Sequence, residues 1–237
     1  MDTEALARST LGGARQLCEL MRPHTWEEVV GQDRAIARLK QAATFGGWGG
    51  KVYALTGASG TGKTTIARLI AAELADPWCV EELNGQDVTA EDLRRWETGM
   101  FLGGLGQRGG RCIIINEFHG LRAAIVRAML TLLEPTGGLP ARWAMVLTTT
   151  ADGLELFEDE HLDASPLMSR CTVKVKLTNQ GLVEAMAPVL QAGAAKYGLN
   201  GQGLGAYKKL MNRVKNNMRD AWQEIQSGAM LGNNPAA

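Results

Sequence analysis

The sequence has few cysteines, no net charge and no long apolar run, and each shortage excludes a class of protein. The four cysteines are widely spaced: Cys18, Cys79, Cys112 and Cys171. None of them forms a short-spaced pair of the kind that holds zinc, and there is no dense framework typical of secreted disulfide proteins. No apolar stretch approaches the length that spans a bilayer or forms a signal peptide. We therefore expect a cytoplasmic protein with no zinc module and no membrane association.

The charge is balanced overall but unevenly distributed. The 25 basic residues match the 25 acidic ones, and 45% of the residues are hydrophobic, which is typical of an ordinary globular chain. The segment from Lys196 to Arg219, however, contains basic residues and no acid. Two interpretations of this basic segment remain open: contacts to DNA phosphates, which supply sequence-independent affinity, or a solvated helix face.

Apolar strand patterns alternate with helical ones through the first three quarters of the chain. Strands are predicted at 51–56, 78–84, 112–116, 143–150 and 172–177, and helices at 32–44, 64–75, 90–97 and 121–134. Such alternation implies crossover connections and a mostly parallel sheet. The sequence therefore predicts an α/β fold with a five-stranded parallel sheet.

The C-terminal quarter shows no strand pattern after residue 177. Residues 180–228 are predicted to be helical, in pieces interrupted by Pro188 and by the glycine-rich stretch 198–205. We expect an α/β domain over residues 1–178, a small helical domain over 179–228 and a frayed tail over 229–237.

A phosphate-binding loop lies between the first predicted strand and its helix. Residues 57–64, "GASGTGKT", match the pattern G-x-x-x-x-G-K-[ST] in the right structural context. The candidate nucleotide-binding residues are Gly57, Ala58, Ser59, Gly60, Thr61, Gly62, Lys63, Thr64 and Thr65. Glycines let backbone N–H groups approach phosphate oxygens, Lys63 would meet the β- and γ-phosphates, and the Thr64 hydroxyl would coordinate Mg²⁺. The predicted cofactors are ATP and Mg²⁺.

The buried strand "RCIIIN" ends where a nucleotide-hydrolysing site usually presents two carboxylates. Here the pair is Asn116 and Glu117. Glu117 is the candidate general base that polarises the attacking water, with capping or pairing at the strand end as the structural alternative. Asn116 keeps an oxygen that can act on Mg²⁺ through water, but it lacks the charge that attracts a hard cation. We therefore expect slow hydrolysis, and we expect Asn116→Asp to raise activity or to lower the Mg²⁺ requirement.

Together with "MRPHTWEEVVGQ" at 21–32 and "VEELNGQDVTAEDLRRW" at 80–96, these motifs resemble the clamp-loader branch of the AAA+ ATPases. The chain is similar to the DNA polymerase III gamma/tau subunit and to the small subunits of phage and archaeal clamp loaders, over roughly residues 16–228. The resemblance implies a P-loop NTPase core with a helical lid, and it places Val29, Val30 and Gly31 beside the adenine. Taken alone, the segment 21–32 predicts only a helix start after a proline.

The resemblance also assigns three further site residues. Thr150, at the end of the strand "VLTTT", occupies the position of the first sensor, which detects the γ-phosphate. Arg170, within the Ser-Arg-Cys triplet at 169–171, is the candidate arginine finger that reaches a neighbouring subunit's ATP. Arg219, within "NNMRDAW", is the candidate second sensor, although Asn216 stands where the family has a small residue.

Asn116 is one departure from the family pattern, and two more limit what the resemblance implies. We expect no counterpart here of the helical collar that holds clamp-loader rings together, and we interpret the acidic insertion at 152–163 as a solvated loop. The implied partners are other AAA+ subunits, a sliding clamp and primed DNA. A non-hydrolysing structural subunit remains an alternative, as does another DNA-transaction ATPase, such as one for transposition or branch migration.

Overall fold

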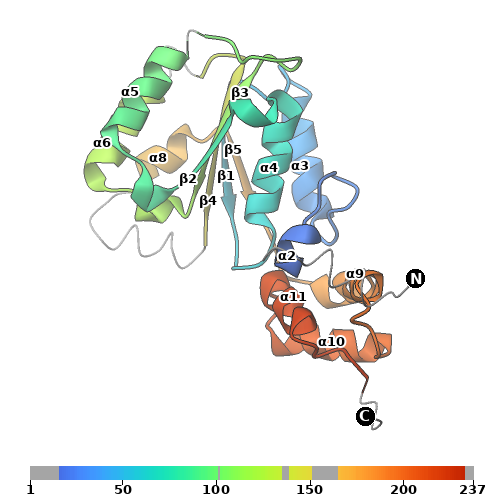
Figure 1. Ribbon diagram of the computed structural model, residues 1–237. Coiled ribbons are helices and arrows are strands. Elements are labelled where there is room, and N and C mark those ends of the chain that lie inside the picture. The colour runs from blue at the N-terminus through green and yellow to red at the C-terminus, as the bar shows by residue number, and fades with distance from the viewer. Residues whose placement is uncertain (1–15, 101, 135–138, 151–164, 233–237) are drawn as a thin grey trace. The chain divides into compact units, whose positions relative to one another are not determined.

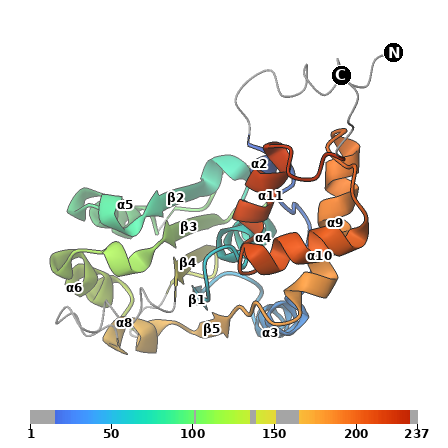
Figure 2. The same ribbon diagram turned by 90° about the horizontal axis from the view of Figure 1, so that it is seen from below.

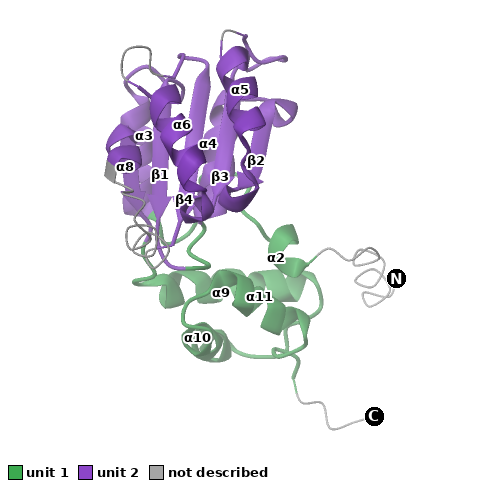
Figure 3. Ribbon diagram, turned by 90° about the vertical axis from the view of Figure 1, so that its left-hand side faces the viewer, with its two compact units in different colours: residues 1–32, 59–62, 178–237 green, residues 33–58, 63–177 purple. Residues whose placement is uncertain are grey.

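The computed structural model describes residues 16–100, 102–134, 139–150 and 165–232. By its internal contacts the chain divides into two compact units, shown in Figure 3. Unit 1 comprises residues 1–32, 59–62 and 178–237, and unit 2 comprises residues 33–58 and 63–177. The tip of the phosphate-binding loop thus belongs by its contacts to unit 1, while both of its ends belong to unit 2.

Unit 2 is built on a five-stranded sheet. The strands are β1 (Lys51–Thr56), β2 (Val80–Asn84), β3 (Arg111–Asn116), β4 (Trp143–Thr149) and β5 (Val173–Lys176). Figure 2 shows their order, β2-β3-β4-β1-β5, and all four pairings are parallel. The predicted five-stranded parallel sheet is confirmed. Because every strand runs the same way, the residues that follow β1, β3 and β4 meet at one edge of the sheet.

Helices cover both faces of this sheet (Figure 1). One face carries α3 (Asp33–Ala43) and α4 (Lys63–Leu74), and the other carries α5 (Ala90–Gly99), α6 (Ala123–Leu132) and α8 (Ser165–Arg170). Short 3₁₀ turns lie at Pro77–Cys79, Gly85–Asp87 and Phe118–Gly120. All seven residues of β4 are buried, as expected for a central strand covered on both sides.

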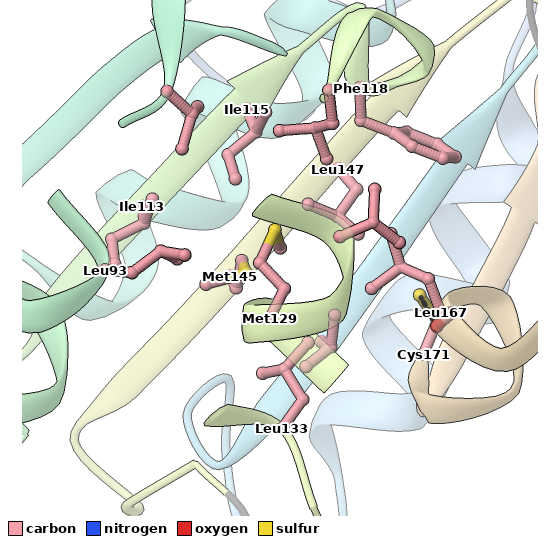
Figure 4. Close-up of a cluster of buried hydrophobic side chains, with 14 of the residues drawn as sticks. Leu93, Ile113, Ile115, Phe118, Met129, Leu133, Met145, Leu147, Leu167 and Cys171 are labelled. Carbon is pink, nitrogen blue, oxygen red and sulfur yellow. Dashed lines mark hydrogen bonds between the residues drawn. The ribbon is translucent and has the colours of Figure 1, made fainter. Parts of the chain in front are cut away.

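The main core lies between the sheet and helices α5, α6 and α8. Figure 4 shows Ile113, Met145 and Leu147 of β3 and β4 gathered with Met129 of α6 and Leu167 of α8. Every one of these side chains is at most 7% exposed. This packing fixes the positions at which β3 and β4 end, and so positions the polar residues that follow.

Two cysteines belong to the interior and not to any reactive site. Burial raises the pKa of the Cys112 thiol to about 12 and that of the Cys171 thiol to about 12. Both therefore remain uncharged thiols near neutral pH. The Cys171 Sγ donates to the Leu167 carbonyl at 3.4 Å, which ties down the end of α8.

Unit 1 is helical. Its helices are α2 (Leu17–Leu20), α9 (Leu182–Lys196), α10 (Leu204–Arg213) and α11 (Met218–Gln226). They share a core that includes Leu17, Leu190, Tyr207, Trp222 and Ile225. The Asn217 side chain caps α11 by accepting hydrogen bonds from the backbone N–H groups of Arg219 and Asp220. The predicted helical character of 180–228 is thus confirmed, including the break between α9 and α10.

Two sequence-based expectations about local structure were wrong, and one short helix was missed. Pro188 lies inside α9 and does not interrupt it, because burial of the flanking Ala187 and Leu190 offsets the one lost backbone hydrogen bond. No helix starts after Pro23: the backbone N–H groups of His24 and Thr25 instead donate to the Glu28 carboxylate in a turn. The short helix α8 was missed, since six residues carry too little periodicity to detect.

The predicted domains 1–178, 179–228 and 229–237 remain a prediction. The contact-based units agree with a change at residue 178 but group residues 1–32 and 59–62 with the C-terminal helices. The acidic insertion at 152–163 and the end of the tail, 233–237, lie outside the described residues. In the part of the chain that is described, no helix is both long and apolar enough to cross a membrane.

Candidate nucleotide-binding site

The phosphate-binding loop leaves β1 at Gly57 and enters α4 at Lys63. Gly60 and Gly62 have φ values of +75° and +95°, a conformation that glycine adopts without strain. The Lys63 side chain is 7% exposed, and its Nζ donates to the carbonyls of Gly57 and Ala58, each at 2.9 Å. The ammonium group is therefore held inside the loop, where phosphate oxygens can replace these carbonyls.

Within unit 1, the tip of the loop is tied to two other segments. The Gln32 side chain is 3% exposed and donates to the carbonyls of Thr61 and Thr178, at 3.3 Å and 2.7 Å. A Cβ added at Gly60 would lie 2.1 Å from Asn217 Oδ1 and 2.8 Å from Asn217 Cα. The N-terminus of α11, which carries Arg219, thus lies directly against the loop tip.

We expect Gly60→Ala to lower the thermal stability of the nucleotide-free protein more than Gly62→Ala does. Both glycines have positive φ, so both substitutions strain the backbone. Only at Gly60 does the new methyl group meet Asn217, since nothing lies within 4 Å of a Cβ at Gly62. Melting temperatures of the two variants measure the difference, and equal losses would show that a methyl group at Gly60 does not clash with Asn217.

The residues expected to act on magnesium lie together at the edge of the sheet. Asn116 Oδ1 accepts a hydrogen bond from Thr64 Oγ1 at 3.1 Å and another from Thr148 Oγ1 at 3.0 Å. A hydroxyl that gives its proton to Asn116 keeps its lone pairs for a cation. Oxygen donors of this kind suit Mg²⁺, which takes few protein ligands and keeps phosphate oxygens and waters. The side chains of Thr64 and Asn116 therefore fit the ion.

Over residues 16–100, 102–134, 139–150 and 165–232, no group of three or more His, Cys, Asp or Glu side chains is placed to hold a metal.

Glu117 directly follows β3 in an uncommon backbone conformation. Its φ is +49°, the left-handed region that non-glycine residues rarely adopt outside functional or turn positions. Its side chain is 51% exposed, and Oε2 lies 3.5 Å from His119 Nδ1, which in turn lies 2.8 Å from Thr149 Oγ1 at the end of β4. The carboxylate is thus presented to solvent beside Asn116 and linked through His119 to the next strand.

The comparison with known families agrees with this geometry. The profile of the ATPase family associated with various cellular activities (AAA) matches residues 53–178, more than half of the chain. The chain belongs to this family. The match includes both the strand before the phosphate-binding loop and the strand that carries Asn116.

Two curated relatives of this AAA ATPase are subunits of replication factor C. The large subunit from Methanocella arvoryzae is 31% identical over 132 residues, which cover 51% of this chain and 24% of that protein. The small subunit from Haloarcula marismortui is 34% identical over 96 residues, which cover 39% of this chain and 29% of that protein. The chain thus spans less than a third of either relative's length.

Solved structures show the fold. The Thermotoga maritima RuvB Holliday junction branch migration motor has a TM-score of 0.63 and 23% identity, covering 87% of this chain and 64% of that chain. A variant of the same protein gives a TM-score of 0.65 at 23% identity, with the same coverage. At this identity the likeness establishes the AAA+ fold alone.

The remaining predicted site residues of this AAA ATPase occupy distinct places in the two units. Thr150 is half-buried and directly follows β4. In unit 1, Val29 and Val30 are half-buried and Arg219 is exposed. The roles that the resemblance implies for these residues stay predictions.

Arg170 is folded against its own helix. Its Nη1 donates to the Pro166 carbonyl at 3.1 Å, and Nη2 lies 3.9 Å from the Glu134 carboxylate. Its Nε is buried and makes no hydrogen bond within the described part of the chain. The contact to the half-exposed Glu134 is long and contributes little to stability.

Sequence reasoning missed five polar residues that shape the site of this AAA ATPase. They are Gln32, Glu82, His119, Thr148 and Asn217. Four of the five stand within two residues of a predicted site residue: His119 near Glu117, Thr148 near Thr150, Gln32 near Gly31 and Asn217 near Arg219. Glu82 stands far along the chain from all of them. The contacts that each of the five makes depend on the tertiary structure.

Proposed function

We propose that this chain is an ATP-binding and ATP-hydrolysing subunit of a clamp-loader-like assembly that acts on DNA. The observation that carries the proposal is the linked arrangement of Lys63, Thr64, Asn116 and Glu117 at one edge of the sheet. Membership of the AAA family and similarity to replication factor C subunits support it.

Each site residue has a definite task in this reaction. Lys63 exchanges its carbonyl partners for β- and γ-phosphate oxygens, and Thr64 turns its free lone pairs to Mg²⁺. The ion, when bound, neutralises the charge that develops on the phosphates. Glu117 accepts a proton from the attacking water, and Thr150 contacts the γ-phosphate.

The resemblance to clamp loaders suggests tasks for three residues of unit 1 and for Arg170. Val29 and Val30 contact the adenine, and Arg219 reaches the phosphates from α11, whose N-terminus lies against Gly60. Arg170 serves the ATP of a neighbouring subunit, because a planar and permanently charged guanidinium matches charge spread over phosphate oxygens.

The proposed partners are other AAA+ subunits, a sliding clamp and primed DNA, in the cytoplasm. The basic segment Lys196–Arg219 gives little support to direct DNA contact. Within unit 1, Lys208 pairs with Glu184, and Arg213 pairs with Glu224 at 2.9 Å. Neighbouring acids from α9 and α11 thus compensate part of the charge, which favours the solvated-face interpretation.

A non-hydrolysing ATP-binding subunit is the second candidate function. Asn116 favours it, because an amide lacks the charge that a carboxylate offers to magnesium. Glu117 argues against it, since its carboxylate is exposed to solvent and can accept a proton from a water molecule. A branch-migration motor shares the fold with this chain, but no feature of the site favours it over the clamp-loader proposal.

Lys63→Ala is expected to abolish both ATP binding and turnover, because it removes the charge that neutralises the phosphates. Binding of a fluorescent ATP analogue and steady-state phosphate release, each with and without primed DNA, measure the two effects. Lys40→Ala, on the exposed side of α3, is the matched control. Tight binding by the natural chain with no turnover under any condition would reject the ATPase and favour the non-hydrolysing subunit.

A further inference from the structure

Glu82, on β2, contacts Asn116. This asparagine stands where a nucleotide-hydrolysing site usually has the first of two carboxylates. Asn116 Nδ2 donates to Glu82 Oε1 at 2.8 Å. A carboxylate can only accept hydrogen bonds when ionised, so the atom of Asn116 that faces Glu82 must be the amide nitrogen. The carbonyl oxygen of Asn116 is thereby directed to the hydroxyls of Thr64 and Thr148.

Arg68 in turn fixes the Glu82 carboxylate. Its Nε donates to Oε2 at 2.7 Å and its Nη2 to Oε1 at 3.2 Å, a two-point contact that sets the plane of the carboxylate. The Glu82 side chain is 27% exposed and that of Arg68 is 45% exposed. Solvent screens this ion pair, so its main effect is on geometry and not on stability.

These contacts form one chain of hydrogen bonds, from Arg68 through Glu82 and Asn116 to Thr64. Every donor in it meets an acceptor, and a hydrogen bond to an ionised group is roughly twice as strong as a neutral one. An aspartate at position 116 would break the chain, since its second oxygen would face the Glu82 carboxylate at the same 2.8 Å. Two like charges at that distance repel one another, and solvent screens only part of this repulsion.

We propose that Glu82 is a positioning residue of the magnesium site. It orients the Asn116 amide so that the carbonyl oxygen faces Thr64, and it makes asparagine the residue suited to position 116. Asn116 and Glu82 then act together as a hydrogen-bonded pair, so the asparagine is more than the absence of a carboxylate. The inference rests on the proposed ATP-dependent function for its effect on Mg²⁺, but the pairing itself can be tested without nucleotide.

The test is a double-mutant cycle of Glu82→Gln, Asn116→Asp and the double variant, read by binding of a fluorescent ATP analogue at stepped Mg²⁺ concentrations. Substitution of a residue that hydrogen-bonds to a metal ligand typically changes the metal affinity about 10–100-fold. We expect Asn116→Asp alone to give no lower Mg²⁺ requirement than the natural chain. In the Glu82→Gln background, where the glutamine amide can donate to the new carboxylate, the same change should lower the requirement about 10-fold.

Glu81→Gln provides the matched control. Glu81 is the neighbour of Glu82 on β2, but its side chain binds Arg95 and Trp96 and not Asn116. In the Glu81→Gln background, Asn116→Asp should behave as it does in the natural chain. Equal gains in Mg²⁺ affinity with and without Glu82 would overturn the inference.

Melting temperatures of the same four nucleotide-free proteins give an independent readout. Asn116→Asp should lower the melting temperature when Glu82 is present and much less when Gln replaces it, because the carboxylate repulsion is then absent. Additive changes would overturn the inference. Failure of the natural chain to bind the ATP analogue at any Mg²⁺ concentration would instead reject the proposed function, and the melting temperatures would still decide whether Glu82 and Asn116 form a pair.

Discussion

Glu117→Gln lowers ATP turnover about 10²–10⁴-fold, which is the usual contribution of a general base, while the affinity for ATP is retained. Glutamine preserves the size of the side chain and its exposed position after β3, but it cannot accept a proton from water. Single-turnover phosphate release measures the loss, and equilibrium binding of an ATP analogue shows that the pocket is intact.

Glu97→Gln is the matched control for this substitution, because Glu97 is an exposed carboxylate on α5. It should leave turnover unchanged. Turnover by the Glu117→Gln variant within about twofold of the natural chain would contradict the assignment of Glu117 as the base, since even the weakest general bases contribute far more.

Arg170→Ala removes the proposed arginine finger and is expected to lower turnover about 10³–10⁵-fold in the assembled state. Arg170→Lys should restore little, because an ammonium group cannot make the two-point contact of a guanidinium. Turnover at protein concentrations that permit assembly measures the loss, and Arg94→Ala, on an exposed position of α5, is the matched control.

Mixing two inactive variants tests whether Arg170 acts on a neighbour. A protomer with Arg170→Ala keeps its own Glu117, and a protomer with Glu117→Gln keeps its own Arg170. An interface between them can therefore hold one complete site. Partial recovery of turnover in the mixture is expected, and a mixture no more active than its parts would show that Arg170 does not serve a neighbouring subunit.

Many residues of the candidate nucleotide site could be predicted from the sequence, because their signals are local. The phosphate-binding loop is a contiguous run whose glycines, lysine and threonine have fixed tasks. Likewise, β3 and β4 are continuous apolar runs with polar residues directly after them, so Asn116, Glu117 and Thr150 could be placed at strand ends. The alternation of strands and helices was enough to predict the five-stranded parallel sheet.

Other features escaped the sequence because they depend on packing. The helix α9 continues through Pro188, since its buried neighbours offset the lost hydrogen bond. The helix that was expected to begin after Pro23 does not form, because the backbone N–H groups of His24 and Thr25 donate to the Glu28 carboxylate instead. In both places a local rule was outweighed by contacts that the rule does not include.

Asn116 shows most clearly what the sequence determined and what only the tertiary structure decided. The sequence by itself determined that an amide stands at the end of β3, and from this alone Asn116→Asp was expected to raise activity or lower the Mg²⁺ requirement. Only the tertiary structure brings Glu82, 34 residues earlier in the chain, to within 2.8 Å of that amide. Because β2 and β3 pair in parallel through a long crossover, no sequence spacing encodes this contact. Under our proposal it removes the gain in Mg²⁺ affinity that the sequence alone predicts for the single substitution.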